Sequence, residues 1–113
     1  VIAPANPSTK GIVSRNILEA LGPEGKLVNV ARGSLVDQAA LIELLETGGL
    51  SAAALDVFEN EPNVPSALCD LDNVVLSPHQ GSRTKEAREA MDAIVVENLR
   101  AHFAGRMPPN LVK

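Results

Sequence analysis

The fold is decided by residues 27–58, which read LVNVARGSLVDQAALIELLETGGLSAAALDVF. Residues 27–31 are a short apolar run rich in Val, which predicts a buried strand, and Arg32, Gly33 and Ser34 end it. Asp37 is a good N-cap for a helix whose apolar residues recur at helical spacing up to Gly48. Residues 52–58 form a second apolar run, near-continuous as expected for a strand covered on both faces. The order of strand, helix and strand predicts a parallel βαβ unit.

Further elements are expected on both sides of this unit. Residues 1–3 resemble the end of a strand, and residues 14–22 form a helix with Ser14 as its N-cap. A helical turn is expected at residues 66–69 and a short strand at residues 73–76. The last element is a long helix from about Thr84 to residue 104. Strands alternating with helices predict an α/β fold with a parallel sheet and right-handed crossovers.

Composition excludes several classes of function. The chain has 113 residues, which is one small domain at most, and its net charge of −4 argues against a nucleic-acid binder. No apolar run approaches the roughly 20 residues of a membrane-spanning helix, so we expect no membrane partner. One cysteine rules out an internal disulfide framework and a cysteine-rich zinc site, and neither histidine has a metal-like partner at helical spacing. We therefore expect no metal.

The polar residues that follow the predicted strands are candidates for a functional site. Ligands of parallel α/β sheets bind beyond the carboxyl ends of the strands. Arg32 follows the first of the central strands, Asp56 and Glu61 lie at and after the second, and His79 follows the last. One Arg, one Asp, one Glu and one His are thus expected on a single edge of the sheet.

These side chains suit acid–base chemistry. A His that exchanges a proton with a substrate needs a partner that holds its ring and favours its charged form, and Glu61 is the candidate partner of His79. Arg32 can grip a substrate carboxylate with its two-pronged guanidinium or polarise a neighbouring carbonyl. The set fits a 2-keto or 2-hydroxy acid. A serine hydrolase is disfavoured because no Ser lies in a Gly-x-Ser-x-Gly turn.

Three blocks of sequence carry a family resemblance. They read LVNVARGSLVD at residues 27–37, LDVFENEP at residues 55–62 and SPHQGS at residues 77–82. In this order they resemble the three signatures of the D-isomer-specific 2-hydroxyacid dehydrogenases, over nearly the whole chain. The most similar branch is that of the hydroxyphenylpyruvate and glyoxylate/hydroxypyruvate reductases. Formate dehydrogenases have Gln where Glu61 stands, which counts against that branch.

The resemblance implies a role for each matching residue. Arg32 would bind the substrate carboxylate and carbonyl, and His79 would be the general acid in reduction and the base in oxidation. Glu61 would pair with His79, and Asp56 would hydrogen-bond the nicotinamide carboxamide of NAD or NADP. The residues expected to contact this cofactor are Ala3, Pro4, Val30, Ala31, Arg32, Asp56, His79 and Gly81.

The resemblance also implies a domain organisation. Residues 1–82 would be the second half of a Rossmann-type NAD(P)-binding domain, and residues 83–113 a terminal helix and tail that return toward a substrate domain. The Gly-x-Gly-x-x-Gly phosphate loop and the position that selects NAD or NADP do not occur in the sequence. We therefore expect a fragment that is inactive alone.

The implied parent is a cytoplasmic homodimer that reduces hydroxypyruvate, glyoxylate or an aryl-pyruvate to a D-2-hydroxy acid. Two alternatives remain open. One is a dehydrogenase-like corepressor that binds NAD(H) as a sensor or scaffold without significant turnover. The other is an autonomous α/β fragment with no activity of its own.

Overall fold

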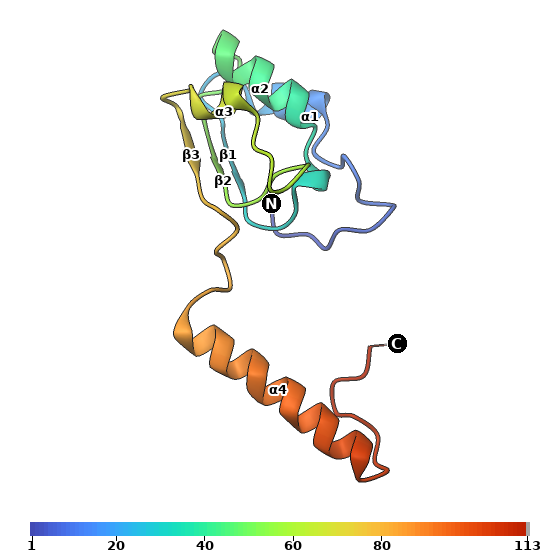
Figure 1. Cartoon of the computed structure of the whole chain (residues 1–113). Helices are drawn as coiled ribbons and strands as arrows, with labels where there is room; N and C mark the ends of the chain where they lie inside the picture. Colours follow the sequence, from blue (N-terminus) through green and yellow to red (C-terminus); the bar gives the residue numbers. More distant parts are fainter. Residues whose placement is uncertain (113) are drawn as a thin grey trace. The chain divides into compact units, whose positions relative to one another are not determined.

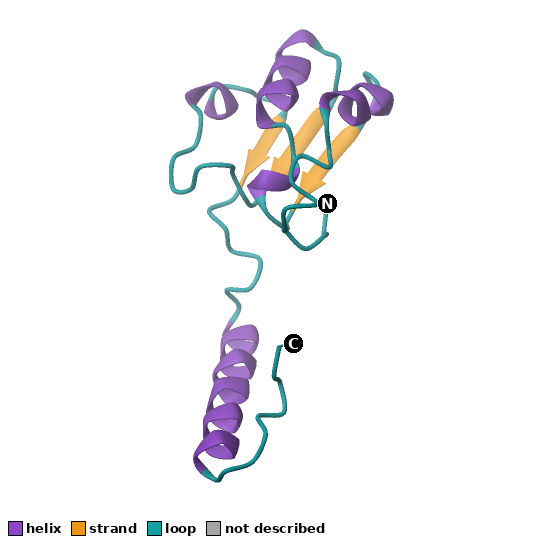
Figure 2. Ribbon diagram, turned by 90° about the vertical axis from the view of Figure 1, so that its right-hand side faces the viewer, coloured by secondary structure: helices purple, strands orange, loops and turns teal. Residues whose placement is uncertain are grey.

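A parallel three-stranded sheet organises the first part of the chain in the computed structural model, which describes residues 1–112. The strands are β1 (Lys26–Asn29), β2 (Ala52–Leu55) and β3 (Val74–Leu76), adjacent in chain order. Figure 2 shows the three arrows pointing toward the same edge, as the parallel registers require. The predicted α/β fold with a parallel sheet is therefore confirmed.

Helices precede the first strand and connect the strands that follow (Figure 1). They are α1 (Arg15–Leu21), the short 3₁₀ helix η1 (Gly33–Leu35), α2 (Gln38–Thr47) and α3 (Ser66–Cys69). Asp37 caps α2 as predicted, since its Oδ1 accepts the N–H of Ala40 at 3.0 Å. Ser14 is the N-cap residue of α1 as predicted, although its side chain makes no cap hydrogen bond.

The core lies on one face of the sheet. Leu27, Ala53 and Leu55 point into it and pack with residues of α1, α2 and α3, such as the fully buried Leu18. The alternate strand residues face the other way, and Val28 and Val75 remain 52% and 68% exposed. The expectation that the strand at residues 52–58 is covered on both faces is met only in part, because Ala53 and Leu55 are buried whereas Ala52 and Ala54 are half-buried. The strands are added in the order β1, β2, β3 across the sheet, so right-handed crossovers place both connecting helices on the same face.

Two of the predicted strands end earlier than expected. β1 ends at Asn29 and β2 at Leu55, although the apolar runs continue beyond them. Val57 and Phe58 are buried without being strand residues, because the chain turns there into the core. Residues 1–3 form no strand, but the amino group of Val1 donates to the carbonyl of Val28 at the edge of β1.

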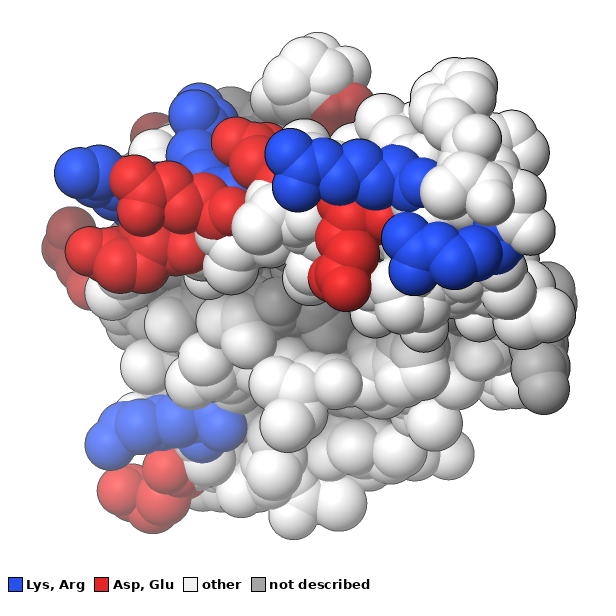
Figure 3. Space-filling view, turned by 90° about the horizontal axis from the view of Figure 1, so that it is seen from below, with Lys and Arg blue, Asp and Glu red and all other residues white. Residues whose placement is uncertain are grey.

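The chain divides into two compact units, Val1–Gln80 and the part from Gly81 onward. The second unit contains α4 (Lys85–Phe103), close to the predicted helix. Thr84 caps it, accepting the N–H of Ala87 at 3.1 Å. The face drawn in Figure 3 carries Lys and Arg beside Asp and Glu, and on α4 Lys85 pairs with Glu89 at 3.7 Å. Within residues 1–112, no helix has the length and apolarity needed to cross a membrane.

Candidate functional site

Just after each strand ends, a main-chain hydrogen bond connects the chain to a neighbouring strand or segment. The N–H of Val30 donates to the carbonyl of Val1 at 3.3 Å, that of Asp56 to Asn29 at 3.0 Å, and that of Ser77 to Leu55 at 2.9 Å. The segments that leave β1, β2 and β3 therefore start from one ordered edge. Arg32, Asp56 and His79 follow these exits, so the sheet brings the candidate residues to one edge as expected.

Glu61 and His79 form a hydrogen-bonded pair. His79 Nδ1 lies 2.7 Å from Glu61 Oε2, and the side chains are 41% and 35% exposed, so a substrate can reach them. The other carboxylate oxygen, Oε1, accepts the N–H of Phe58 at 3.0 Å. The bond to His79, and after it the Phe58 N–H and the charge of Arg32, hold the pKa of Glu61 below its ordinary value. A charged Glu61 fixes the imidazole and leaves Nε2 as the nitrogen that can exchange a proton.

The backbone of His79 is held in an uncommon conformation. Its φ is 53°, in the left-handed region that costs a residue with a side chain roughly 1–2 kcal/mol. Asp56, which is 8% exposed, accepts the N–H of Gln80 at 2.8 Å through Oδ1. The N–H of His79 itself donates to Ser77 at 3.0 Å. A buried carboxylate at the end of β2 thus anchors the turn that presents the imidazole.

Arg32 is exposed at the start of the η1 turn. Its Nη1 donates to the carbonyl of Ala31 at 2.6 Å. Beneath it, the buried Asn29 donates from Nδ2 to the Arg32 carbonyl at 3.0 Å and accepts the Ala31 N–H at 3.1 Å. The charge of Arg32 is the weakest of the causes that lower the pKa of Glu61.

Gly33 lets the Arg32 turn touch the segment that carries Glu61. A Cβ built on Gly33 would lie 2.0 Å from the carbonyl carbon of Phe58 and 2.4 Å from the nitrogen of Glu59. No side chain fits between two backbones at that distance. The arginine turn and the Phe58–Glu61 segment therefore pack as one piece.

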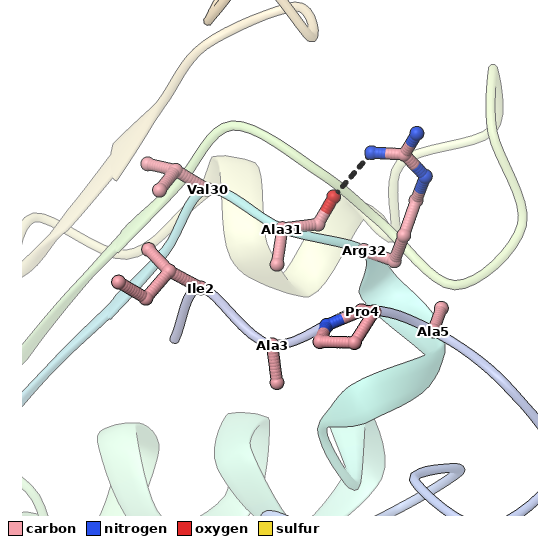
Figure 4. Close-up of a pocket in the computed structure, with 7 residues that line it drawn as sticks. All are labelled: Ile2, Ala3, Pro4, Ala5, Val30, Ala31 and Arg32. Carbon is pink, nitrogen blue, oxygen red and sulfur yellow. Dashed lines mark hydrogen bonds between the residues drawn. The ribbon is translucent and has the colours of Figure 1, made fainter. Parts of the chain in front are cut away.

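Two pockets flank these groups. One, of about 510 Å³, lies between residues 2–5 and residues 30–32, which run side by side in Figure 4. It includes five of the predicted cofactor residues, namely Ala3, Pro4, Val30, Ala31 and Arg32. Asp56 and His79 do not line it, and Gly81 belongs to the second unit. The other pocket, of about 170 Å³, is mainly apolar and adjoins the pair, lined by Phe58, Glu61, Pro62, Val64, Pro78 and His79.

Asn29 and Gly33 are site residues that the sequence reasoning missed. A signal for Asn29 was present, since it is the one polar residue inside the apolar run at residues 27–31. It lies two residues after Leu27, so in a strand both side chains point to the same face. Gly33 shows no comparable signal, because its contact is with a residue far along the chain. Within residues 1–112, no group of three or more His, Cys, Asp and Glu side chains is placed to hold a metal ion.

Comparison with known proteins gives consistent matches. Residues 1–81 match the family model described as "D-isomer specific 2-hydroxyacid dehydrogenase, NAD binding domain". Over 94% of its length the chain is 50% identical to hydroxyphenylpyruvate reductase of Plectranthus scutellarioides, and 52% identical to glyoxylate/hydroxypyruvate reductase A of Arabidopsis thaliana. It covers 34% of either protein, so it spans about a third of these relatives.

A solved structure shows the same fold. The NADPH-dependent glyoxylate/hydroxypyruvate reductase of Sinorhizobium meliloti, in complex with NADP and malonate, superposes with a TM-score of 0.88 at 52% identity. The match covers 91% of this chain and 32% of that one.

Proposed function

Because the chain belongs to the D-isomer specific 2-hydroxyacid dehydrogenase family through its NAD-binding domain, we propose that it supplies the acid–base residues of a keto-acid reductase. The substrate would be hydroxypyruvate, glyoxylate or an aryl-pyruvate, reduced to a D-2-hydroxy acid with NADH or NADPH. The observation that carries the proposal is the Glu61–His79 pair at 2.7 Å, at the sheet edge where β1 also leads to Arg32. The activity would belong to a protein that combines this chain with a phosphate loop and a substrate domain.

His79 would act as general acid in the reduction. Its Nδ1 faces Glu61, so Nε2 is the atom that donates a proton to the keto oxygen and takes one from the hydroxyl in the reverse direction. The carboxylate of Glu61 stabilises the protonated ring before transfer and keeps Nε2 aimed outward afterwards. The left-handed turn anchored by Asp56 sets where that nitrogen stands.

Arg32 would bind the substrate. An exposed guanidinium with only one of its N–H groups on Ala31 has donors left for a carboxylate in a two-pronged pairing. The charge also polarises a carbonyl next to that carboxylate, where negative charge develops during reduction.

The residues present fit part of a dinucleotide. The pocket of about 510 Å³ falls in the ordinary range for small-molecule sites, and Ile2 and Val30 give it apolar walls for a flat ring (Figure 4). Ala3, Pro4, Val30 and Ala31 would hold the nicotinamide end, and Asp56 would accept from its carboxamide. When bound, the dinucleotide would supply the hydride. Gly81, a homodimeric assembly and a cytoplasmic location are implied by the family resemblance and belong to the same proposal. No observation favours the corepressor alternative.

The test is a histidine pair of variants in the full-length protein, assayed by oxidation of NADPH with hydroxypyruvate. We expect His79→Gln to lower kcat about 10²–10⁴-fold, the usual loss for a general acid, while the Kd for NADPH is retained. His102→Gln, which changes the other histidine of the chain, on α4, is the matched control and should leave kcat unchanged. Turnover of His79→Gln at the parent rate would refute the proposal.

A further inference from the structure

We infer that Asn29 is a positioning residue for Arg32, holding the turn on which the guanidinium rests. The inference rests on the proposed function, because it assigns Asn29 a part in binding the substrate carboxylate. Asn29 is 1% exposed, and both polar atoms of its amide are used within three residues of the chain. Nδ2 donates to the carbonyl of Arg32 and Oδ1 accepts the N–H of Ala31.

The backbone of Asn29 is fixed independently of its side chain. As the last residue of β1 it pairs with Leu55 of β2, and its carbonyl accepts the N–H of Asp56 at 3.0 Å. The amide therefore reaches from a rigid strand to a turn that has left the sheet. It is the direct side-chain link between β1 and the arginine turn.

The amide bonds lead directly to the guanidinium. Arg32 Nη1 donates to the carbonyl of Ala31, the same residue whose N–H is held by Asn29. The Arg32 carbonyl is held by Asn29 and by the N–H of Leu35 at 3.3 Å. Asn29 thus constrains the N–H of Ala31 on one side and the carbonyl of Arg32 on the other. The Ala31 carbonyl, which orients the guanidinium, lies between these two constrained groups.

The chemistry requires an amide. One side-chain atom must donate and the other must accept, and among side chains of this size only Asn supplies both in a fixed geometry. Asp would place an acceptor against the Arg32 carbonyl and a charge in a site with 1% exposure. Ala would leave the Ala31 N–H without its partner and the Arg32 carbonyl with the Leu35 N–H alone, so the turn could relax and the guanidinium could sample other directions.

The chain contains a matched control for a purely structural amide. Asn73 lies just before β3, at the opposite end of the sheet, and is partly buried. Its Nδ2 donates to the carbonyls of Leu45 at 3.3 Å and Ser51 at 3.2 Å. Asn29→Ala and Asn73→Ala therefore each remove two side-chain hydrogen bonds at an end of the same sheet. Only the bonds of Asn29 hold the turn that carries Arg32.

The experiment compares both variants in the full-length protein, well below their unfolding temperatures. The substrates are hydroxypyruvate and glycolaldehyde, which lacks the carboxylate. We expect Asn29→Ala to raise the KM for hydroxypyruvate about tenfold, the size expected for the loss of one or two hydrogen bonds, and to lower the preference for hydroxypyruvate over glycolaldehyde. The Kd for NADPH should not change. Asn73→Ala should lower only the Tm.

Arg32→Gln, measured with the same two substrates, distinguishes a failure of the proposed function from a failure of the inference about Asn29. If Arg32→Gln keeps the preference for hydroxypyruvate, the proposed role of Arg32 fails, and the inference fails with it. If Arg32→Gln loses the preference but Asn29→Ala behaves like Asn73→Ala, only the inference is overturned.

A double variant gives a second readout. When Arg32 is already Gln, adding Asn29→Ala should leave the KM where it is, because a positioning residue acts through the group it positions. An unchanged tenfold effect in that background would overturn the inference. Should Asn29→Ala fail to fold, Asn29→Ser, which keeps a polar group at the site, takes its place in both comparisons.

Discussion

Gly33→Ala should push the turn that carries Arg32 away from the Phe58–Glu61 segment. The added Cβ would lie 2.0 Å and 2.1 Å from the carbonyl carbon and oxygen of Phe58. Carbon atoms in ordinary contact are about 3.5 Å apart or more, so the Arg32 turn and the Phe58 segment must part by about 1.5 Å. Because the N–H of Phe58 holds Glu61, the shift reaches the pair with His79. A displacement of about 1 Å at a site can cost about 10²-fold in rate, and we expect a loss of kcat/KM of at least that size.

The assay measures kcat/KM with hydroxypyruvate together with the free energy of unfolding. Overpacking at Gly33 should also lower stability by about 1–3 kcal/mol. Gly48→Ala is the matched control, because Gly48 has a φ of 75° with no atom within 4 Å of its missing Cβ. That variant strains the backbone by roughly 1–2 kcal/mol at the end of α2, away from the site. It should therefore lose comparable stability and keep its activity.

Two results would refute this reasoning. If Gly33→Ala keeps full kcat/KM, the close approach of the two segments does not position the site. If Gly48→Ala loses activity to the same degree at equal stability, the effect is one of folding and not of geometry.

Three further substitutions test other parts of the structure. The pKa of Glu61 lies below its ordinary value, so its carboxylate stabilises the fold fully above about pH 4.3 and ceases to do so as pH falls through the lower folded pKa. Glu61→Gln should therefore be less stable than the parent at pH 7, and urea titrations should show this difference in stability narrowing as the pH falls below about 4.3. A difference that does not vary with pH would contradict the lowered pKa of Glu61. Asp37→Ala removes the cap bond to Ala40 and should cost about 0.5–2 kcal/mol by thermal unfolding, and an unchanged Tm would argue against that cap. Leu41→Ala, at 1% exposure, should cost about 2–5 kcal/mol by the same measurement, whereas a loss below 1 kcal/mol would mean that the core relaxes around it.

The order of helices and strands could be predicted because apolar periodicity and caps are local signals. Asp37 and Thr84 cap their helices as expected, and the single turn at α3 (Ser66–Cys69) occurs where it was predicted. The strand ends could not be predicted in the same way. Apolar side chains indicate burial, and Val57 and Phe58 are buried in a loop and not in a strand. Which face of the sheet stays open depends on the chain path and not on any one segment.

The placement of Arg32, Asp56 and His79 beyond the strand ends at one edge could be predicted from strand order alone, since parallel strands end at one edge. Their finer geometry could not. The approach of Gly33 to Phe58 and the anchoring of Gln80 by Asp56 join residues that are distant in the chain. No local pattern encodes such contacts, and they are the contacts that set the directions of the functional groups.

The main-chain hydrogen bonds just after the three strands affect which substitutions the carboxyl edge of the sheet can accept. The bonds made by the N–H groups of Val30, Asp56 and Ser77 involve backbone atoms alone, so any residue except Pro at those positions can make them. Substitutions beyond the exits can then alter what the edge recognises while the path of the chain stays in place. Changes at positions such as Val64, which lines the small apolar pocket, would alter the shape of that pocket without rebuilding the scaffold.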